Sequence, residues 1–438
     1  MLSEAKNAWE ALAPFRKNRD RCRDYTFGRQ WNDIINVDGK FMTEYDYILR
    51  EGNIPLKNNL IRRIVRNVLG VFRKELPAMM KGYDGELAEI SRLNSLPELL
   101  GRTMEEFLIS GMAVHRKSFG LRNGRSGVFT DIVSPASFFF NTSARDIRGW
   151  DINLAGQIHD VSFHDWCAAF VKDKASYDRA RSFFKDKTST VRVTEIWRRE
   201  FRPRMLVHDR RRAILRKIDL PASEDNPDAA KTLRPEAPVN IEHLWRYYFL
   251  TEEGEVLAEG DSPYRHGSHP YVVKCYPYLD GEIQSFVGDM IDQQRYANRL
   301  ITLYDWVMRA SAKGVLLLPE GAVAPDNLQA VADQWSRFNG VIVYKARPGI
   351  PDPHQVNAAN ANMGISELLD IQLKMLEDVS GVNGVLQGNL SSNSVSGTLF
   401  NQQTENARTS LSDILDTFRS FIEAGCEKDL ALLNQTSS

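Results

Sequence analysis

The sequence is poor in the features that mark disulfide-bonded, zinc-binding and membrane-spanning proteins. It has four cysteines in 438 residues, and none of them forms a C-x-x-C pair, so neither a disulfide framework nor a zinc knuckle is indicated. No apolar run approaches the roughly 18 residues that a membrane-spanning helix needs. The opening residues, MLSEAKNAWEAL, carry charges where a signal peptide has an apolar core. We therefore expect a protein that folds in a cytosol.

An excess of basic residues is also missing. Lys and Arg number 56 against 57 Asp and Glu, which gives a formal net charge of -1. Proteins that grip DNA usually carry a basic excess, because each neutralised phosphate adds affinity. The balance argues against a repressor, polymerase or nuclease. It is compatible with a channel through which a duplex slides, since weak or repulsive walls keep the duplex mobile.

Local catalytic motifs are absent as well. The sequence has no Walker loop, G-x-G-x-x-G, H-E-x-x-H, G-x-S-x-G or kinase set. His159 and His164 are five residues apart, which on a helix places them on different faces, so we interpret them as surface histidines rather than metal ligands. His266 and His269 lie in a Gly/Ser/Pro turn and are expected to be structural. No catalytic residue, metal or cofactor is predicted, although an enzyme whose site is assembled from distant residues stays possible.

What the sequence does contain is an α+β pattern with two amphipathic helices in its second half. Its hydrophobic content of 42% and charged content of 26% are ordinary for a globular protein of two or three units. Helical spacing covers residues 52–77 and 97–113, and residues 162–184 are also expected to be helical. Alternating or β-branched runs predict strands over Val114–Gly120, Gly127–Val133, Phe138–Asn141, Val191–Arg198, Arg204–His208, Trp245–Leu250 and Tyr271–Tyr276.

Two neighbouring segments in this body differ sharply in charge. Residues 192–217 hold ten Lys or Arg against three acids, whereas residues 219–242 are acidic and proline-rich and are expected to form a long loop. The pair either neutralises itself at the surface or forms one half of an interface with an adjacent subunit.

The two amphipathic helices flank a small insert. The second helix has an apolar stripe of Ile365, Leu368, Leu369, Leu373, Leu376 and Val379. Stepping about 100° per residue places Glu367, Asp370, Lys374, Glu377 and Asp378 on the opposite side, so one face is expected to pack and the other to be wet and net acidic. The insert predicts a strand over residues 314–318, a helix over 326–337 and a strand over 340–344, and it is too small to bury a core alone.

The order helix, insert, helix, followed by GVNGVLQGNLSSNSVSGTLFNQQTENA, resembles the stem, clip and tunnel-loop succession of tailed-phage portal proteins. The stretches YTFGRQW and GNIPLKNNLIRRIVRNVLG resemble the start of portals of the podovirus P22-like group. The resemblance implies an α+β portal fold with these parts: a wing at 1–283 (helical N-terminus plus α+β body), a first stem helix at 284–312, a clip at 313–357, a second stem helix at 358–380, a tunnel loop at 381–397, and a C-terminal wing helix at 398–438 with a short or absent crown.

The same resemblance implies a non-enzymatic head-tail connector. It would be made in the host cytoplasm and form a dodecameric ring at the portal vertex of the virion, through which double-stranded DNA is packaged, retained and ejected. Its expected partners are the terminase motor, tail adaptor proteins, and capsid and scaffolding proteins, with no membrane and no cofactor. An α+β hydrolase-like enzyme with a helical appendage is the alternative, and the mass in solution separates the two.

Three groups of site residues follow. The acidic side of the second helix, Glu367, Asp370, Lys374, Glu377 and Asp378, is expected to line the channel. Residues 381–397 are uncharged and rich in Gly, Asn and Ser, and they predict a mobile loop that contacts DNA through Asn383, Gln387, Asn389, Ser391, Ser392 and Asn393. Tail docking is expected at the clip residues Asp326, Asn327, Gln329, Asp352 and His354.

Overall fold

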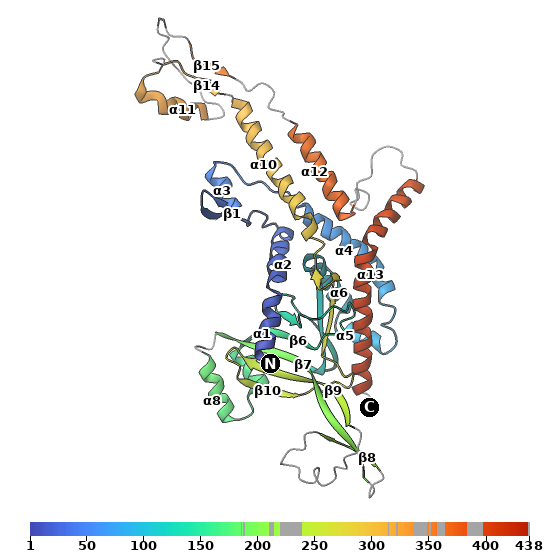
Figure 1. The fold of residues 1–438 in the computed structure, drawn as a ribbon. Coiled ribbons are helices and arrows are strands. Elements are labelled where there is room, and N and C mark those ends of the chain that lie inside the picture. Colours follow the sequence, from blue (N-terminus) through green and yellow to red (C-terminus); the bar gives the residue numbers. More distant parts are fainter. Residues whose placement is uncertain are drawn as a thin grey trace. The chain divides into compact units, whose positions relative to one another are not determined.

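The computed structural model describes residues 1–184, 186, 189–209, 214–219, 239–313, 315–320, 323–336, 348–349, 352–356, 364–382 and 397–436. Contacts between Cα atoms divide the chain into two compact units, and each unit draws on separate stretches of sequence. The first comprises Met1–Phe27, Ile61–Met290 and Ser380–Ser438; the second comprises Gly28–Leu60 and Ile291–Val379. Helices and strands mix throughout, as the α+β prediction requires (Figure 1).

The first unit holds most of the helices. They are α1 (Leu2–Ala11), α2 (Ala13–Thr26), α4 (Leu60–Met79), α5 (Leu87–Leu93), α6 (Leu96–Ser110), α7 (Phe163–Phe170), α8 (Lys174–Phe183) and α13 (Gly397–Thr436). The helix α4 shows why the pattern folds this way, because its buried residues Ile61, Ile64, Val65, Val68 and Phe72 recur every three or four positions along one face.

The strands of the first unit form antiparallel sheets. A six-stranded sheet has the order β10-β9-β7-β6-β5, with β8 paired to β7, and a three-stranded sheet has the order β11-β3-β4. The bounds are β3 (Met112–Arg122), β4 (Arg125–Ile132), β5 (Phe138–Phe140), β6 (Leu154–Ser162), β7 (Thr190–Asp209), β8 (Ile214–Asp219), β9 (Val239–Thr251), β10 (Val256–Asp261), β11 (Tyr271–Cys275), β12 (Pro277–Leu279) and β13 (Glu282–Ile283).

Four phenylalanines join α4, α6 and α13 in the core. The rings of Phe72 and Phe418 lie 5.2 Å apart edge to face, and those of Phe107 and Phe418 lie 5.4 Å apart. Phe421 continues the cluster at 5.4 Å from Phe418. Because aromatic pairs add about 0.5–1.5 kcal/mol beyond the burial of their area, this cluster anchors the long α13 to helices early in the chain.

A glycine makes the turn from α6 into β3. Gly111 caps the helix in the left-handed region at φ 80°, and a Cβ there would lie 2.3 Å from the Gln284 carbonyl oxygen. Only glycine fits this combination of backbone angle and backbone approach.

The second unit contains an N-terminal arm, residues Gly28–Leu60, and two long helices. The arm has the hairpin β1 (Ile34–Val37) and β2 (Lys40–Thr43) followed by α3 (Glu44–Arg50). The helix η1 (Gly288–Met290) ends the preceding stretch of the first unit and leads into α10 (Ile291–Lys313). The other elements of the second unit are β14 (Val315–Leu317), η2 (Pro325–Asn327), α11 (Leu328–Ser336), β15 (His354–Val356) and α12 (Ile365–Ser380).

Several predicted boundaries are wrong. The strand β7 is continuous across the two predicted strands, and residues 162–184 form two helices, α7 and α8, rather than one. The first long helix begins at Ile291, not at Gln284, and the 3-10 helix η1 at Gly288–Met290 precedes it. Strands β6, β8 and β10 were not predicted, because their sequences do not alternate clearly between apolar and polar residues. They are stabilised by pairing, β6 and β8 with β7 and β10 with β9.

No helix in the described stretches combines the length and the hydropathy that crossing a membrane requires.

Candidate functional site

The arm is bound to α10 by a regular series of hydrogen bonds. The N–H groups of Leu56, Asn58 and Leu60 donate to side-chain oxygens of Thr302, Asn298 and Gln294, at 3.2, 3.2 and 2.9 Å. Two residues of extended chain rise about 6.6 Å, and four residues of helix rise about 6 Å, so every second arm residue meets every fourth helix residue. The polar side of α10 therefore holds a chain segment there instead of facing water.

Asn298 is the centre of this series. It is fully buried, its Oδ1 also accepts from Gln294 Nε2 at 3.0 Å, and its Nδ2 donates to Gln30 Oε1 at 2.7 Å. Asn298 and Thr302 lie on the polar side of an amphipathic helix, which the sequence pattern alone would place in water. The structure buries both, because the arm supplies partners for their amide and hydroxyl groups.

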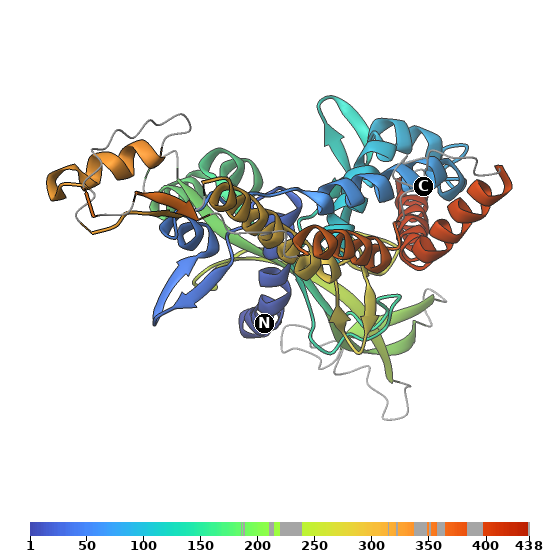
Figure 2. The same cartoon turned by 90° about the horizontal axis from the view of Figure 1, so that it is seen from above.

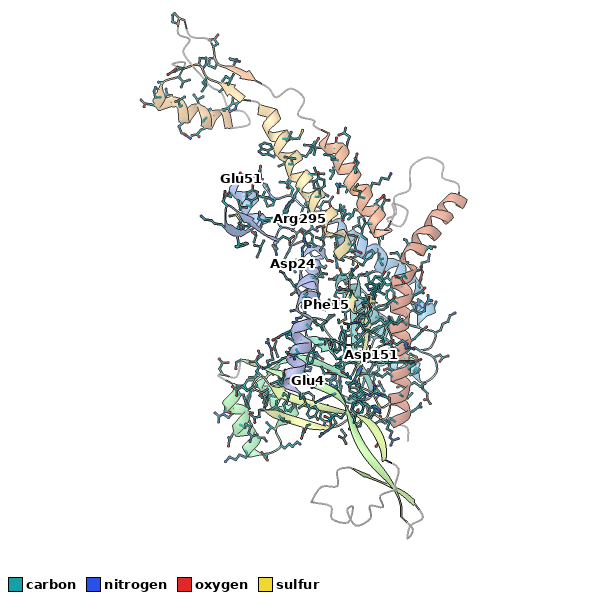
Figure 3. All side chains as sticks on the ribbon, viewed as in Figure 1. Glu4, Phe15, Asp24, Glu51, Asp151 and Arg295 are labelled. Carbon is teal, nitrogen blue, oxygen red and sulfur yellow. The ribbon has the colours of Figure 1, made fainter. Side chains whose placement is uncertain are left out.

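A buried carboxylate adds an ionic contact between the arm and α10. Glu44, the first residue of α3, accepts hydrogen bonds from Arg295, whose Nε lies 3.0 Å from Oε1, and from Arg299. Arg295, which is labelled in Figure 3, also lies 3.9 Å from Asp33. Two guanidinium groups thus compensate the charge of one buried acid.

The helix α12 exposes its acidic residues as expected, but its apolar stripe is only partly buried. Glu367, Asp370, Lys374 and Asp378 are exposed, and Glu377 is half-buried. Ile365 and Leu376 are buried, whereas Leu368 and Val379 are 40% and 48% exposed. Within the described part of this single chain, the predicted apolar face of α12 is therefore only partly packed.

The clip residues lie in small elements. The predicted strand at 314–318 appears as β14, and the predicted helix appears as η2 and α11. β14 pairs antiparallel with β15, which was not predicted, while residues 340–344 lie outside the described residues. Asp326, Asn327, Gln329, Asp352 and His354 are all exposed.

The predicted tunnel loop lies outside the described residues except at its ends. Asn383, Gln387, Asn389, Ser391, Ser392 and Asn393 fall within the stretch 383–396 that the structure does not describe. At the near end, Gly381 has φ 65° and its carbonyl accepts from Ser410 Oγ at 3.1 Å, and Val382 is buried. These contacts fix where the chain leaves α12.

The first unit contains a buried ionic network that sequence reasoning missed. Lys117 on β3 donates to Asp429 on α13 at 2.6 Å and to Thr130 at 2.9 Å, and the Tyr83 hydroxyl donates to the same Asp429 oxygen at 2.8 Å. Burial lowers the pKa of Lys117 and raises that of Asp429, although each charge opposes the shift of the other. Lys117, Asp429 and Thr130 are buried and pair with one another, so the network has the character of a structural tie.

Among the described residues, no group of three or more His, Cys, Asp or Glu side chains is placed to hold a metal ion. His159 lies on β6 rather than on a helix, and its Nε2 is 2.9 Å from Glu195, so the interpretation as an ordinary surface histidine is wrong. Burial raises the pKa of Glu195, but hydrogen bonds from His159 and Trp197 and the charge of Arg116 outweigh it and hold the pKa below its usual value.

Comparison with known proteins gives one result across almost the whole chain. The family model described as phage P22-like portal protein matches residues 2–437. No curated protein matches the sequence.

Proposed function

The chain belongs to the phage P22-like portal protein family, and from this premise we propose how its parts divide the work of the portal. Portal proteins of this family are structural virion components without enzymatic activity, and they assemble as oligomeric rings that take part in phage head assembly and packaging. The proposal concerns the stoichiometry, the partners and the residues.

The ring is proposed to be a dodecamer, made in the host cytoplasm and placed at one capsid vertex. It packages, retains and releases double-stranded DNA, and it binds the terminase motor, tail adaptors, and capsid and scaffolding proteins. The wing is assigned to residues 1–283, and the stem to 284–312 and 358–380, which contain α10 and α12. The clip is assigned to 313–357, the tunnel loop to 381–397, and the C-terminal wing helix with a minimal crown to 398–438.

The exposure of the acidic side of α12 is the observation that carries the channel proposal. Glu367, Asp370 and Asp378 are exposed on one side of a long helix, with Lys374 among them. Repeated around a ring, these carboxylates form a sleeve that repels phosphates, so a duplex slides without being held. Glu377 borders the same side and completes the proposed channel lining.

The clip is proposed to be the tail-docking surface. Asp326 and Asn327 lie in η2 and Gln329 lies in α11, whereas Asp352 precedes β15 and His354 is its first residue. All five are exposed polar side chains on short elements, where a partner binds without displacing a core. Particles whose clip is deleted should fail to join tails, and normal tail joining by such particles would contradict this assignment.

The tunnel loop is proposed to contact DNA through its Asn, Gln and Ser side chains. Its composition supports this, because uncharged amides and hydroxyls make weak hydrogen bonds to phosphates that exchange easily. A connection between two antiparallel helices needs only about 2 to 8 residues, and this one is about twice as long.

The experiment has two steps that separate assembly from DNA handling. Sedimentation of the purified chain at micromolar concentration should show a ring of about twelve copies, and a folded monomer would overturn the assembly proposal. Shortening residues 387–394 should then leave the ring intact while the particles lose or fail to retain their genome. Full packaging and retention by the shortened variant would overturn the role of the loop in DNA contact.

A further inference from the structure

The helix α12 carries an exposed apolar stripe that the rest of the described chain leaves open. Leu368, Ile371, Met375 and Val379 are 40%, 48%, 47% and 48% exposed, and their spacing of three, four and four residues aligns them along the helix. Ile371 and Met375 were not part of the predicted packing face. A row of exposed large apolar side chains of this kind marks an interaction surface.

Helix geometry places this stripe between two other sides of α12. At about 100° per residue, the buried Ile365 and Leu376 lie on one flank of the stripe, and Glu367 and Asp378 lie on the other flank. One side of the helix therefore packs within its own chain, the next is apolar and open, and the third is acidic. That order suits a helix in a ring wall, with its own chain on one side, a neighbour beside it and the channel beyond.

A complementary apolar groove lies between the arm and α10. It has a volume of about 430 Å³, and its apolar lining comes from Trp31, Ile35, Tyr47, Ile48, Leu303 and Trp306. The hydrogen-bond series and the Glu44 ion pairs hold its two walls together, so the groove is formed within one chain. Leu303 is 44% exposed and Trp306 is 50% exposed, which leaves apolar area for a partner to bury.

The arm and α12 lie on opposite sides of α10, as Figures 1 and 2 both show. In a closed ring of identical copies, one surface of each copy meets a different surface of the next, so a cyclic interface requires two complementary patches that face opposite ways. The groove beside the arm and the stripe on α12 are two different apolar patches of one chain, as such an interface needs.

We propose that the exposed stripe of α12 seats in the groove between the arm and α10 of the neighbouring copy in the portal ring. The proposal rests on the ring assembly of the family and assigns the lateral contact of the stem to named residues. The mode is a helix laid into an apolar groove, with anchors at successive turns. A large aromatic residue such as Trp306 at the centre of the contact is typical of residues that dominate interface energies.

Polar groups at the edges fit the same partner. Glu44 lines the groove, and its Oε2 is buried without a hydrogen-bond partner among the described residues, although its Oε1 is paired. Gln372 on α12 offers N–H donors beside the stripe. Half of the Arg299 side chain also stays exposed at the groove.

The test uses oxidation of engineered thiols between copies. Chains with Trp306→Cys and chains with Ile371→Cys are co-expressed, assembled and oxidised, and non-reducing gels should show a cross-linked dimer. Each single variant alone should give no more dimer than the unmodified chain. Since the two new thiols lie on different chains, the product reports a contact between copies and excludes a bond within one chain.

The matched control pairs Ile371→Cys with Leu121→Cys, because Leu121 at the end of β3 is 73% exposed and lies in the first unit. Rings that form but cross-link no better than this control overturn the stem contact and leave ring assembly standing. An unmodified chain that forms no ring overturns both. As a second readout, Ile371→Glu should shift rings toward smaller species on dilution at least tenfold more than Leu121→Glu, and an equal effect of the two variants counts against the proposal.

Discussion

Single buried charges tie the distant parts of the α+β body together. Lys117 and Asp429 are 312 positions apart in sequence, and each is almost completely buried. A buried ion pair is weak evidence for added stability compared with an apolar pair, but removing one member leaves an uncompensated charge in the core. The pair therefore makes the placement of α13 against β3 specific.

We expect Lys117→Met to lower the free energy of unfolding by about 3–5 kcal/mol, because Asp429 then stays buried without its cation. Urea unfolding of the purified chain measures the loss. The matched control is Arg122→Met on the same strand, whose ion pair with Asp131 is about half exposed and should cost about 1 kcal/mol or less. Equal losses in the two variants would show that Lys117 is not buried as a charge.

Buried histidines predict a loss of stability in acid. Burial and the charge of Lys428 lower the pKa of His266 to about 4, and burial also places the pKa values of His115 and His269 well below 6.5. The unfolded chain binds more protons than the folded chain below pH 6.5, so for His266 the stability falls as the pH drops from 6.5 toward 4.

Urea unfolding at pH 7.5, 6 and 5 should show this decline, and His266→Asn should make it shallower. A stability that stays level or rises over this range in the unmodified chain would contradict the direction of the three shifts.

At the scale of elements, the arm is held by side chains rather than by a sheet. Its extended segment has backbone donors facing α10, and the helix supplies an acceptor at every fourth position. A β-strand would satisfy such donors with another strand. Here the side chains of α10 accept these hydrogen bonds instead, because two extended residues and four helical residues rise by nearly the same length.

We expect Asn298→Leu to release the arm while leaving the first unit folded. The substitution removes partners from the Asn58 N–H, Gln30 and Gln294, and each unsatisfied buried group costs about 1–3 kcal/mol. Trypsin should then cut faster after Arg50 and Lys57, which are exposed on the arm. Asp292→Ala, at an exposed position of the same helix, serves as the control and should leave the cleavage rate unchanged.

At the scale of the whole molecule, the balance of charge fits a conduit. A net charge of -1 per chain provides no general attraction for a polyanion, and the acidic side of α12 adds local repulsion. The assembled portal is therefore expected to bind linear duplex DNA weakly, with little dependence on salt.

The double variant Asp370→Lys with Asp378→Lys should bind duplex DNA at low salt and lose this affinity as the salt concentration rises. The reason is that each copy gains four units of positive charge along the proposed channel. Fluorescence anisotropy with a labelled duplex at two salt concentrations measures it. The control, Glu86→Lys with Glu89→Lys, adds the same positive charge at two exposed positions, one just before α5 and one within it. If the control binds equally, the acidic side of α12 has no special position toward DNA.

Local periodicity explains why the helices were predictable and the strands less so. The buried positions of α4 and the apolar set of α13, including Leu411, Ile414, Leu415 and Phe418, follow from a 3.6-residue period within single segments. The strand β7 is long and rich in charge, and β6, β8 and β10 lack clean alternation. Their existence depends on partners elsewhere in the chain, which a local pattern does not contain.

The sequence by itself determined the α+β class, the succession of long helices and insert, and the resemblance that the family match confirmed. These depend on composition, spacing and order, which are properties of neighbouring residues. Only the tertiary structure decided that Lys117, Glu44 and Asn298 are buried, that the arm lies on α10, and that part of the apolar face of α12 is exposed. Burial is set by which distant segments supply hydrogen bonds, charges and apolar area, and no local pattern encodes those pairings.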